Sequence, residues 1–294
     1  MAPPGREELL DCTREEVRRL YQERHRFFFG VPEFGALLAS LPCYPILDDH
    51  EIHDNIGSAP EHATARWRAL REGARDAFFD YQASRVLERP GPSFHYGFSQ
   101  GPVAVFVMDV RSERIADDET MNVFGDAQLR DLKDFLLAHA SSPVVAIVVS
   151  VPLAYITSDT VRKLLVFGGQ SSDAADRWSN PKALRSRTML LGALRAHQRA
   201  HPNQRLILLS GDIHVGSLLR IDWPDGLPPA HQFTSSAISN LQPRVAQWAA
   251  EQIPRVLPKF ADPDELEAAV AIVPGVGGAD ENPDRKSTRL NSSH

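Results

Sequence analysis

The sequence predicts an α/β protein, because helical patterns alternate with short apolar runs along most of its 294 residues. Three runs, 103–108, 144–149 and 206–210, consist almost wholly of aliphatic and aromatic residues. Such continuous apolar runs are typical of strands that are buried on both faces of a sheet. The length suits one large domain or two small ones, and it is ample for a hydrophobic core.

The segments between these runs predict the remaining elements in order. Apolar residues at helical spacing predict helices over 13–28, 33–40, 62–88, 125–138, 182–201, 241–253 and 264–273. Shorter apolar or alternating runs predict strands over 43–47, 94–98, 217–222 and 231–235, the last two in a second sheet layer. We expect the aromatic residues of the first two helices to lie in the core.

Composition excludes several classes of function. The net charge is −6, so no broad basic surface for nucleic acid is expected. The two cysteines form neither a disulfide framework nor a zinc-type pair. No apolar stretch approaches the roughly 18 residues that a membrane-spanning helix needs. The polar first residues contain no visible signal peptide.

A cluster of charged residues follows the apolar run 43–47. Asp48, Asp49, His50 and Glu51 are adjacent, and burying such residues costs several kcal/mol unless a cation or good partners compensate. One interpretation is therefore a metal-and-acid site with oxygen and imidazole ligands. The other is a polar turn whose aspartates cap the next helix.

A second cluster, Gly211 to Gly216, follows the run 206–210. Strand-like alternation would place Asp212 and His214 on the same side of the chain. Strand ends that bring polar side chains to one edge are where α/β sheets hold their sites. We therefore expect the Asp49–His50 turn and the Asp212–His214 turn to converge on one metal site.

Five segments, in the same order along the chain, resemble conserved blocks of the PhoD-like phosphatases, a family of the calcineurin-like metallophosphoesterases. Each block alone is weak, but the ordered set is highly specific. The segments are LDDHEIHDN (47–55), FVMDVRSER (106–114), FGDAQLRDLKDFL (124–136), LLSGDIHVG (208–216) and TSSAISN (234–240).

This resemblance implies a fold and a domain layout. The fold would be a four-layer α/β/β/α sandwich over residues 1–273, followed by a disordered or artefactual tail over 274–294. Family members begin with strands that carry a G-D-x-x-x-x-D block, whereas this chain begins in the helix that follows. We therefore expect an N-terminal portion with further metal ligands to be missing, and this chain to hold only part of the site.

The resemblance also implies a chemistry. Asp49, Asp212 and His214 would be metal ligands, and His50 would donate a proton or contact the phosphate. Two metal ions, iron and calcium by resemblance, would support hydrolysis of small phosphate esters, both monoesters and diesters. Family members are often exported, but neither the compartment nor the oligomeric state of this chain follows from its sequence.

Three functions remain open at this point. The chain could be part of a PhoD-like phosphoesterase, the scaffold could carry a different metal-dependent hydrolase, or it could be a non-catalytic binding module without metals. Near the end of the run 103–108, Asp109, Arg111 and Arg114 either pair with one another or supply a phosphate-binding arginine.

Overall fold

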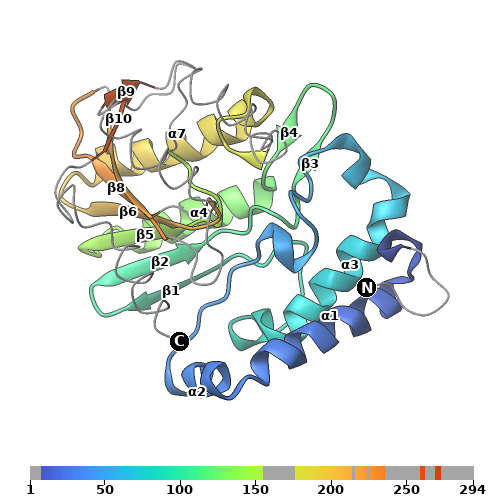
Figure 1. Cartoon of the computed structure of the whole chain (residues 1–294). Coiled ribbons are helices and arrows are strands. Elements are labelled where there is room, and N and C mark those ends of the chain that lie inside the picture. Colours follow the sequence, from blue (N-terminus) through green and yellow to red (C-terminus); the bar gives the residue numbers. More distant parts are fainter. Residues whose placement is uncertain are drawn as a thin grey trace, which may run out of the picture. The chain divides into compact units, whose positions relative to one another are not determined.

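The computed structural model describes residues 8–154, 176–213, 216–223, 225–235, 259–261 and 269–272. The chain divides into two compact units, one formed by 1–96 and 107–129 and the other by 97–106 and 130–294. Figure 1 labels the elements of both units. No helix among the described residues is long and apolar enough to cross a membrane.

The first unit is mainly helical. Its helices are α1 (Arg14–Phe29), α2 (Pro32–Ser40) and α3 (Ala65–Tyr81), with short 3-10 turns at Leu9–Asp11, Asp49–Glu51, Pro60–Ala63 and Ala83–Arg85. A small hairpin joins β3 (Ile115–Ala116) to β4 (Met121–Asn122). The helix predicted over 13–28 is confirmed, and Thr13 and Glu16 form a capping box at its start.

Helices α1 and α3 lie side by side and run in the same direction. Arg14 pairs with Asp76, and one turn further along Arg18 pairs with Asp80. Gly73 permits the close approach, because a Cβ atom there would lie 2.4 Å from the Arg14 carbonyl oxygen and 2.8 Å from the Val17 Cβ. The contact therefore depends on a residue without a side chain.

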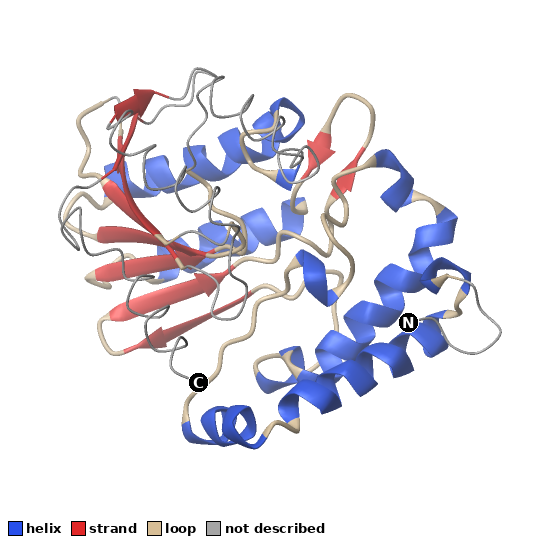
Figure 2. Ribbon diagram, in the orientation of Figure 1, coloured by secondary structure: helices blue, strands red, loops and turns tan. Residues whose placement is uncertain are grey.

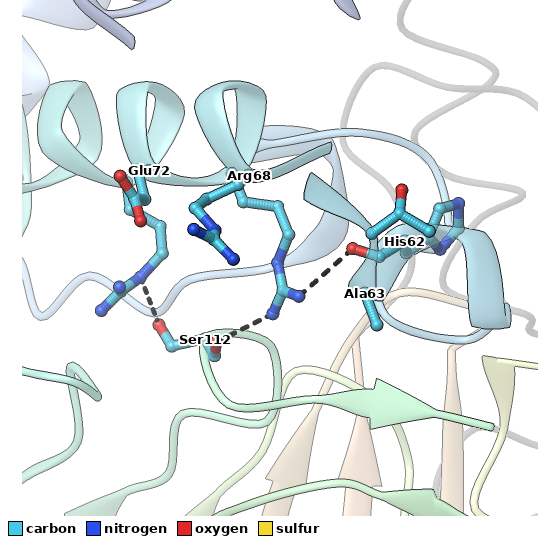
Figure 3. A pocket seen from close by; sticks show the side chains of 8 residues that line it. His62, Ala63, Arg68, Glu72 and Ser112 are labelled. Atoms are coloured by element: carbon cyan, nitrogen blue, oxygen red, sulfur yellow. Dashed lines mark hydrogen bonds between the residues drawn. The ribbon is translucent and has the colours of Figure 1, made fainter. Parts of the chain in front are cut away.

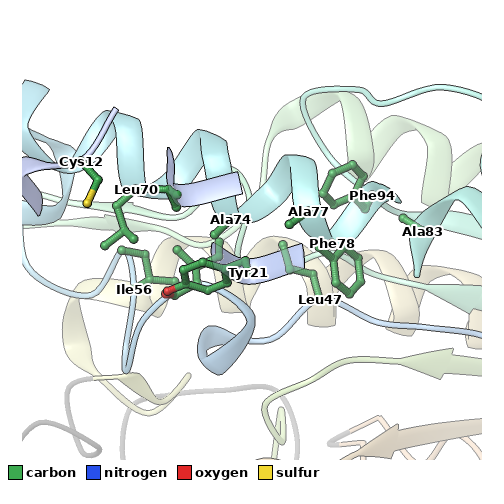
Figure 4. Packing of buried hydrophobic residues seen from close by; sticks show 12 residues of the cluster. Cys12, Tyr21, Leu47, Ile56, Leu70, Ala74, Ala77, Phe78, Ala83 and Phe94 are labelled. Atoms are coloured by element: carbon green, nitrogen blue, oxygen red, sulfur yellow. The ribbon is translucent and has the colours of Figure 1, made fainter. Parts of the chain in front are cut away.

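A buried apolar cluster fills the space beneath this helix pair (Figure 4). The Tyr21 hydroxyl in this cluster donates a hydrogen bond to the Ile52 carbonyl and so connects α1 to the turn after Asp49. The cluster consists of Cys12, Val17, Tyr21, Leu47, Ile52, Ile56, Leu70, Ala74, Ala77, Phe78, Ala83 and Phe94.

The second unit is built on an eight-stranded sheet with the order β1-β2-β5-β6-β8-β7-β10-β9. The strands are β1 (Tyr96–Gln100), β2 (Val103–Val107), β5 (Val144–Val148), β6 (Arg205–Ser210), β7 (Ser217–Asp222), β8 (Ala230–Thr234), β9 (Lys259–Ala261) and β10 (Ala269–Ile272). Strands β5, β6 and β8 are parallel, whereas β7, β10 and β9 continue the sheet in antiparallel pairs.

Two long helices accompany this sheet. Helix α4 (Asp126–Ala138) begins in the first unit and ends in the second, and α7 (Leu184–Ala200) is the described helix of the connection between β5 and β6. Both helices lie on the same face of the sheet in Figure 2. The parallel order of β5 and β6 requires such a crossover, and its helix packs back onto the sheet. The α/β prediction is thus confirmed.

Several predictions about elements are wrong. Residues 43–47 form no strand, since Pro45 has no N–H to donate to a sheet ladder, and only Leu47 of this run is buried. Strands β7 and β8 belong to the same sheet as β6, and not to a second layer. The helix predicted over 264–273 contains β10 instead.

The aromatic residues at the end of α1 and in α2 were expected in the core, but Phe27, Phe28 and Phe34 are exposed to 72%, 50% and 38%. Helix α2 buries none of its residues. The second sheet of the sandwich remains a prediction. The helix predicted over 241–253 and the tail 274–294 lie outside the described residues.

Candidate metal and phosphate site

The turn at Asp49 is organised by its own carboxylate. Asp49 is only 3% exposed, and its Oδ1 accepts a hydrogen bond from the His50 backbone N–H at 2.8 Å. Its Oδ2 accepts from the Asn55 backbone N–H, also at 2.8 Å. Asn55 has a positive φ of 55°, a conformation that Asn tolerates better than most residues. Asp49 therefore holds backbone N–H groups of its own turn, whereas the N-cap of the short 3-10 turn is Asp48 and that of helix α3 is Thr64.

The two hydrogen bonds to Asp49 leave its carboxylate able to bind a ligand. A carboxylate has about four acceptor positions, and each Asp49 oxygen uses one of them on a backbone N–H. Burial raises the pKa of Asp49. The positive charge of Arg111 lowers this pKa and the negative charge of Asp48 raises it, and the net shift is upward. A carboxylate that is costly to ionise in isolation gains stability when a cation binds beside it.

Arg111 supplies one such cation. Its side chain is 0% exposed, and its Nε donates to Asp48 Oδ1 at 2.8 Å. Its Nη2 lies 4.0 Å from Asp49 Oδ1. The sequence predicted either pairing among Asp109, Arg111 and Arg114 or a phosphate-binding arginine, and neither prediction included Asp48. Arg111 therefore pairs with Asp48 and lies close to Asp49.

The loop that carries Arg111 is held by two buried polar side chains. Asp109 Oδ1 accepts from the backbone N–H groups of Arg111 and Ser112 at 3.0 and 2.8 Å. The amide of Gln128 pairs with the backbone of Asp109, accepting from its N–H and donating to its carbonyl oxygen, each at 2.8 Å. Gln128 therefore acts on Arg111 through Asp109.

His50 is the exposed member of the site. Its Nε2 lies 3.5 Å from Asp54 Oδ1, and both side chains are more than half exposed. One donor atom each from Asp49, His50 and Asp54 lie within 4.8 Å of one another. Two carboxylates and an imidazole at this spacing fit a hard or borderline divalent cation.

Glu51 completes the acidic turn. Its Oε2 accepts from the Asp48 backbone N–H at 3.0 Å. Burial, and then the charge of Asp48, raise the pKa of Glu51 to about 7. Glu51 therefore faces the protein and caps the turn, whereas His50 faces solvent.

Asp212 lies in the second unit, just beyond the end of the central parallel strand β6. It has a φ of 65°, and the neighbouring Gly211 donates its N–H to the Ser150 carbonyl oxygen at 3.0 Å. This carboxyl-end location agrees with the expectation for an α/β site. His214 lies outside the described residues. The convergence of Asp212 and His214 with Asp49 therefore stays a prediction.

Reasoning from the sequence missed the pairing of Arg111 with Asp48 and the role of Gln128. Both residues lie in the quoted segments 106–114 and 124–136, but no local periodicity connects them to the Asp49 turn. A polar Gln on the buried side of the helix that becomes α4 was the available signal, since buried amides require partners.

Comparison with known proteins bears on the same residues. A family described as PhoD-like phosphatase matches residues 5–260. A solved structure of PhoD matches with a TM-score of 0.57 and 18% sequence identity, over 78% of this chain and 45% of that one. At this identity the likeness shows the fold alone, and this chain spans less than half the length of that protein. No curated protein matches the chain.

The match to the family extends from before α1 to β9, and so includes the Asp49 turn, the Arg111 loop, Gln128 and Asp212. It covers well over half of the chain. The chain therefore belongs to the PhoD-like phosphatase family.

Proposed function

We propose that this chain takes part in metal-dependent hydrolysis of phosphate esters. Asp49, Asp212 and His214 are the proposed metal ligands, and His50 is the proposed group that acts on the substrate. The observation that carries the proposal is the buried Asp49 carboxylate, which keeps free acceptor positions beside His50 and Asp54. Membership of the phosphatase family supports the same chemistry.

The described residues divide the work in this proposal. Arg111 favours the ionised form of Asp49 and pairs with Asp48, so that Asp49 can offer an oriented oxygen. His50 is exposed and has Asp54 beside one ring nitrogen, an arrangement that orients an imidazole for proton transfer to a leaving alkoxide. Bound metal ions would supply positive charge for the phosphate oxygens and would acidify water.

Three proposed ligands are few for two metal ions, because even a closed tetrahedral site uses four. We therefore propose that this chain holds a partial centre that binds metal weakly. Iron and calcium are the proposed metals, and a second sheet beyond the described strands is part of the proposed fold.

Metal analysis of the purified chain tests this assignment. In equilibrium dialysis against iron or calcium, the wild-type chain should bind metal, and Asp49→Asn and Asp212→Asn should bind at least about tenfold less at the same free metal concentration. Asp118→Asn, in an exposed turn, is the matched control and should behave like the wild type. Equal metal content in all four proteins would remove Asp49 and Asp212 from the ligand set.

Turnover tests the substrate class. With metal present, we expect release of nitrophenol from a nitrophenyl phosphate monoester and from the corresponding diester, and the ratio of the two rates gives the preference. His50→Gln should lower kcat by about a hundredfold or more if His50 transfers a proton. An unchanged kcat would exclude His50 from the reaction.

A second candidate is a binding module that keeps the scaffold without metals. This candidate is favoured by the two hydrogen bonds that Asp49 accepts from backbone N–H groups, because they already give the carboxylate a structural role. The metal analysis separates the two candidates: a wild-type chain that retains no metal under any loading condition supports the binding module.

A further inference from the structure

A pocket of about 190 Å³ lies in the first unit, between the start of α3 and the loop that carries Arg111. Three arginines from one face of α3 line it, and Ser112 forms the opposite wall (Figure 3). The lining residues are His62, Ala63, Thr64, Arg68, Arg71, Glu72, Arg75 and Ser112.

The positive charge in this pocket is not neutralised by ion pairs. Arg71 donates to the backbone carbonyl oxygens of His62, Ser112 and Arg114, at 3.2 to 3.4 Å. Carbonyl oxygens satisfy hydrogen bonds but carry no formal charge. Burial, and then the charge of Arg75, lower the pKa of Arg71, so this guanidinium is held where positive charge is unfavourable.

Arg75 also donates mainly to uncharged oxygens, and burial lowers its pKa, although the nearby carboxylates of Asp109, Asp76 and Glu113 act in the opposite direction. Its Nε donates to Ser112 Oγ at 3.0 Å, and its Nη2 donates to the carbonyl oxygens of Gly91 and Pro92. Its guanidinium also lies over the Phe94 ring at 4.7 Å. The one acidic residue of the lining, Glu72, pairs with Arg14 on the neighbouring helix at 3.2 Å.

Donors remain available at the mouth of the pocket. Arg68 is exposed and forms no hydrogen bond or ion pair with any other residue in the described part of the chain. Figure 3 shows its side chain extending from α3 toward the Ser112 wall. The Ser112 hydroxyl accepts from Arg75, and its own proton is free to donate. The N-terminal end of α3 adds partial positive charge at the same place.

We propose that this pocket binds a tetrahedral oxyanion, namely inorganic phosphate or the phosphoryl group of a small phosphomonoester. Arg68 and the Ser112 hydroxyl contact the anion directly, and Arg71 and Arg75 stabilise it from the buried side. All the lining residues lie outside the Asp49, His50 and Asp54 group, so the pocket is separate from the proposed metal site.

Chemistry favours this class of ligand. Planar guanidinium forks match the oxygens of phosphate, and charge-assisted bonds to them are stronger than neutral ones. The pocket volume of about 190 Å³ equals that of several water molecules, which is enough for a phosphate with part of its hydration shell.

Isothermal titration of inorganic phosphate into the full chain tests the proposal. The titration is done with chelator present, so that phosphate cannot bind through metal at Asp49. We expect saturable binding that Arg68→Ala weakens about tenfold, the effect of losing a charge-assisted hydrogen bond. Arg68→Ala should fold normally, since Arg68 is exposed and forms no interaction with the rest of the described chain.

Matched variants make the result specific. Arg130→Ala removes an exposed arginine from α4 and should leave the dissociation constant unchanged. Asp49→Asn should also leave it unchanged, because no metal is present at Asp49 under these conditions, and a loss of binding in this variant would overturn the assignment to the arginine pocket. Glycerol 3-phosphate in place of phosphate distinguishes a phosphoryl group from the free anion. Equal affinity of wild type and Arg68→Ala, or equal binding of chloride and phosphate, would overturn the proposal.

Discussion

Three buried polar residues of the first unit hold backbone turns, and one of those turns presents a candidate site residue. Asp49 accepts hydrogen bonds from two backbone N–H groups of its own turn, and Asp109 accepts hydrogen bonds from the backbone N–H groups of Arg111 and Ser112. Gln128 in turn pairs with the backbone of Asp109. Because buried polar groups are costly when unpaired, each of these side chains stabilises both the fold and the geometry of the site.

Gln128→Ala tests this dependence. The change leaves the N–H and the carbonyl oxygen of Asp109 without their buried partner, and each loss costs about 1 to 3 kcal/mol. We expect the free energy of unfolding in urea to fall by about 2 to 6 kcal/mol in total. Lys133→Ala on the exposed side of the same helix is the control, and a similar effect of both changes would contradict the role given to Gln128.

His25 makes stability depend on pH. Burial, and then the charge of Arg24, lower the pKa of His25 below its usual 6.5, and its ring stacks on Tyr81 with centroids 5.4 Å apart. The unfolded chain therefore binds a proton at a pH where the folded chain does not. The contribution of His25 to stability is complete above pH 6.5 and is lost as the pH falls from 6.5 toward the lowered pKa.

His25→Phe keeps an aromatic ring but cannot titrate. We expect the wild type to lose more free energy of unfolding than this variant when the pH falls from about 7.5 to about 5.5. Urea unfolding of both proteins at the two pH values measures the difference, since the other histidines are common to both. Parallel losses in the two proteins would show that His25 does not titrate in this range.

At the level of elements, the contact between α1 and α3 organises the first unit. The pairs between Arg14 and Asp76 and between Arg18 and Asp80 are partly exposed, so each contributes at most about 1 kcal/mol. The buried cluster and the close approach at Gly73 contribute more, because packing responds to changes as small as a methyl group.

Gly73→Ala should therefore destabilise the chain, although alanine is the better helix former. The added methyl would lie 2.4 Å from the Arg14 carbonyl oxygen, which is backbone and cannot rotate away, so we expect a cost of about 1 to 3 kcal/mol. Gly192→Ala in α7 is the matched control, since nothing lies within 4 Å of a Cβ there. That change should stabilise by about 0.5 to 1 kcal/mol. Thermal or urea unfolding that shows Gly73→Ala to be as stabilising as Gly192→Ala would contradict the close contact.

The elements that the sequence predicted correctly carry a local signal. The helix over 13–28 has both an apolar stripe and a capping pair, and the strand over 144–149 is apolar throughout. Residues 43–47 are also mostly apolar, but they form no strand because Pro45 has no N–H to donate to a sheet. The prediction considered the apolar pattern and not the effect of Pro45. The exposure of Phe27 and Phe34 was also not predictable, because periodicity gives a face and not what covers it.

The candidate site was predicted in the same partial way. Adjacent charges marked Asp49 and His50, but the partner of Asp48 is Arg111, which is 63 residues away and belongs to another loop. The spacing of Arg68, Arg71 and Arg75 places them on one face of a helix, but it does not show that Ser112 lies opposite and closes a pocket. Such contacts between distant segments require coordinates.

At the scale of the whole molecule, the proposed metal ligands belong to different units. Asp49 lies in the unit formed by 1–96 and 107–129, and Asp212 and His214 belong to the unit that contains the sheet. A ligand that binds only the folded state stabilises it by an amount set by its concentration and affinity. If both units contribute ligands to one centre, metal must stabilise them together.

Calorimetry with and without metal tests this coupling. At a free metal concentration about 100 times the dissociation constant, we expect about 2.7 kcal/mol of added stability, seen as a higher unfolding temperature. Asp49→Asn and Asp212→Asn should each abolish the whole increase, although the two residues belong to different units. The double variant should behave like either single one, because residues that act through one centre are not additive. If metal still raised the unfolding temperature of Asp212→Asn but not that of Asp49→Asn, the metal would bind to the first unit alone, through Asp49, His50 and Asp54.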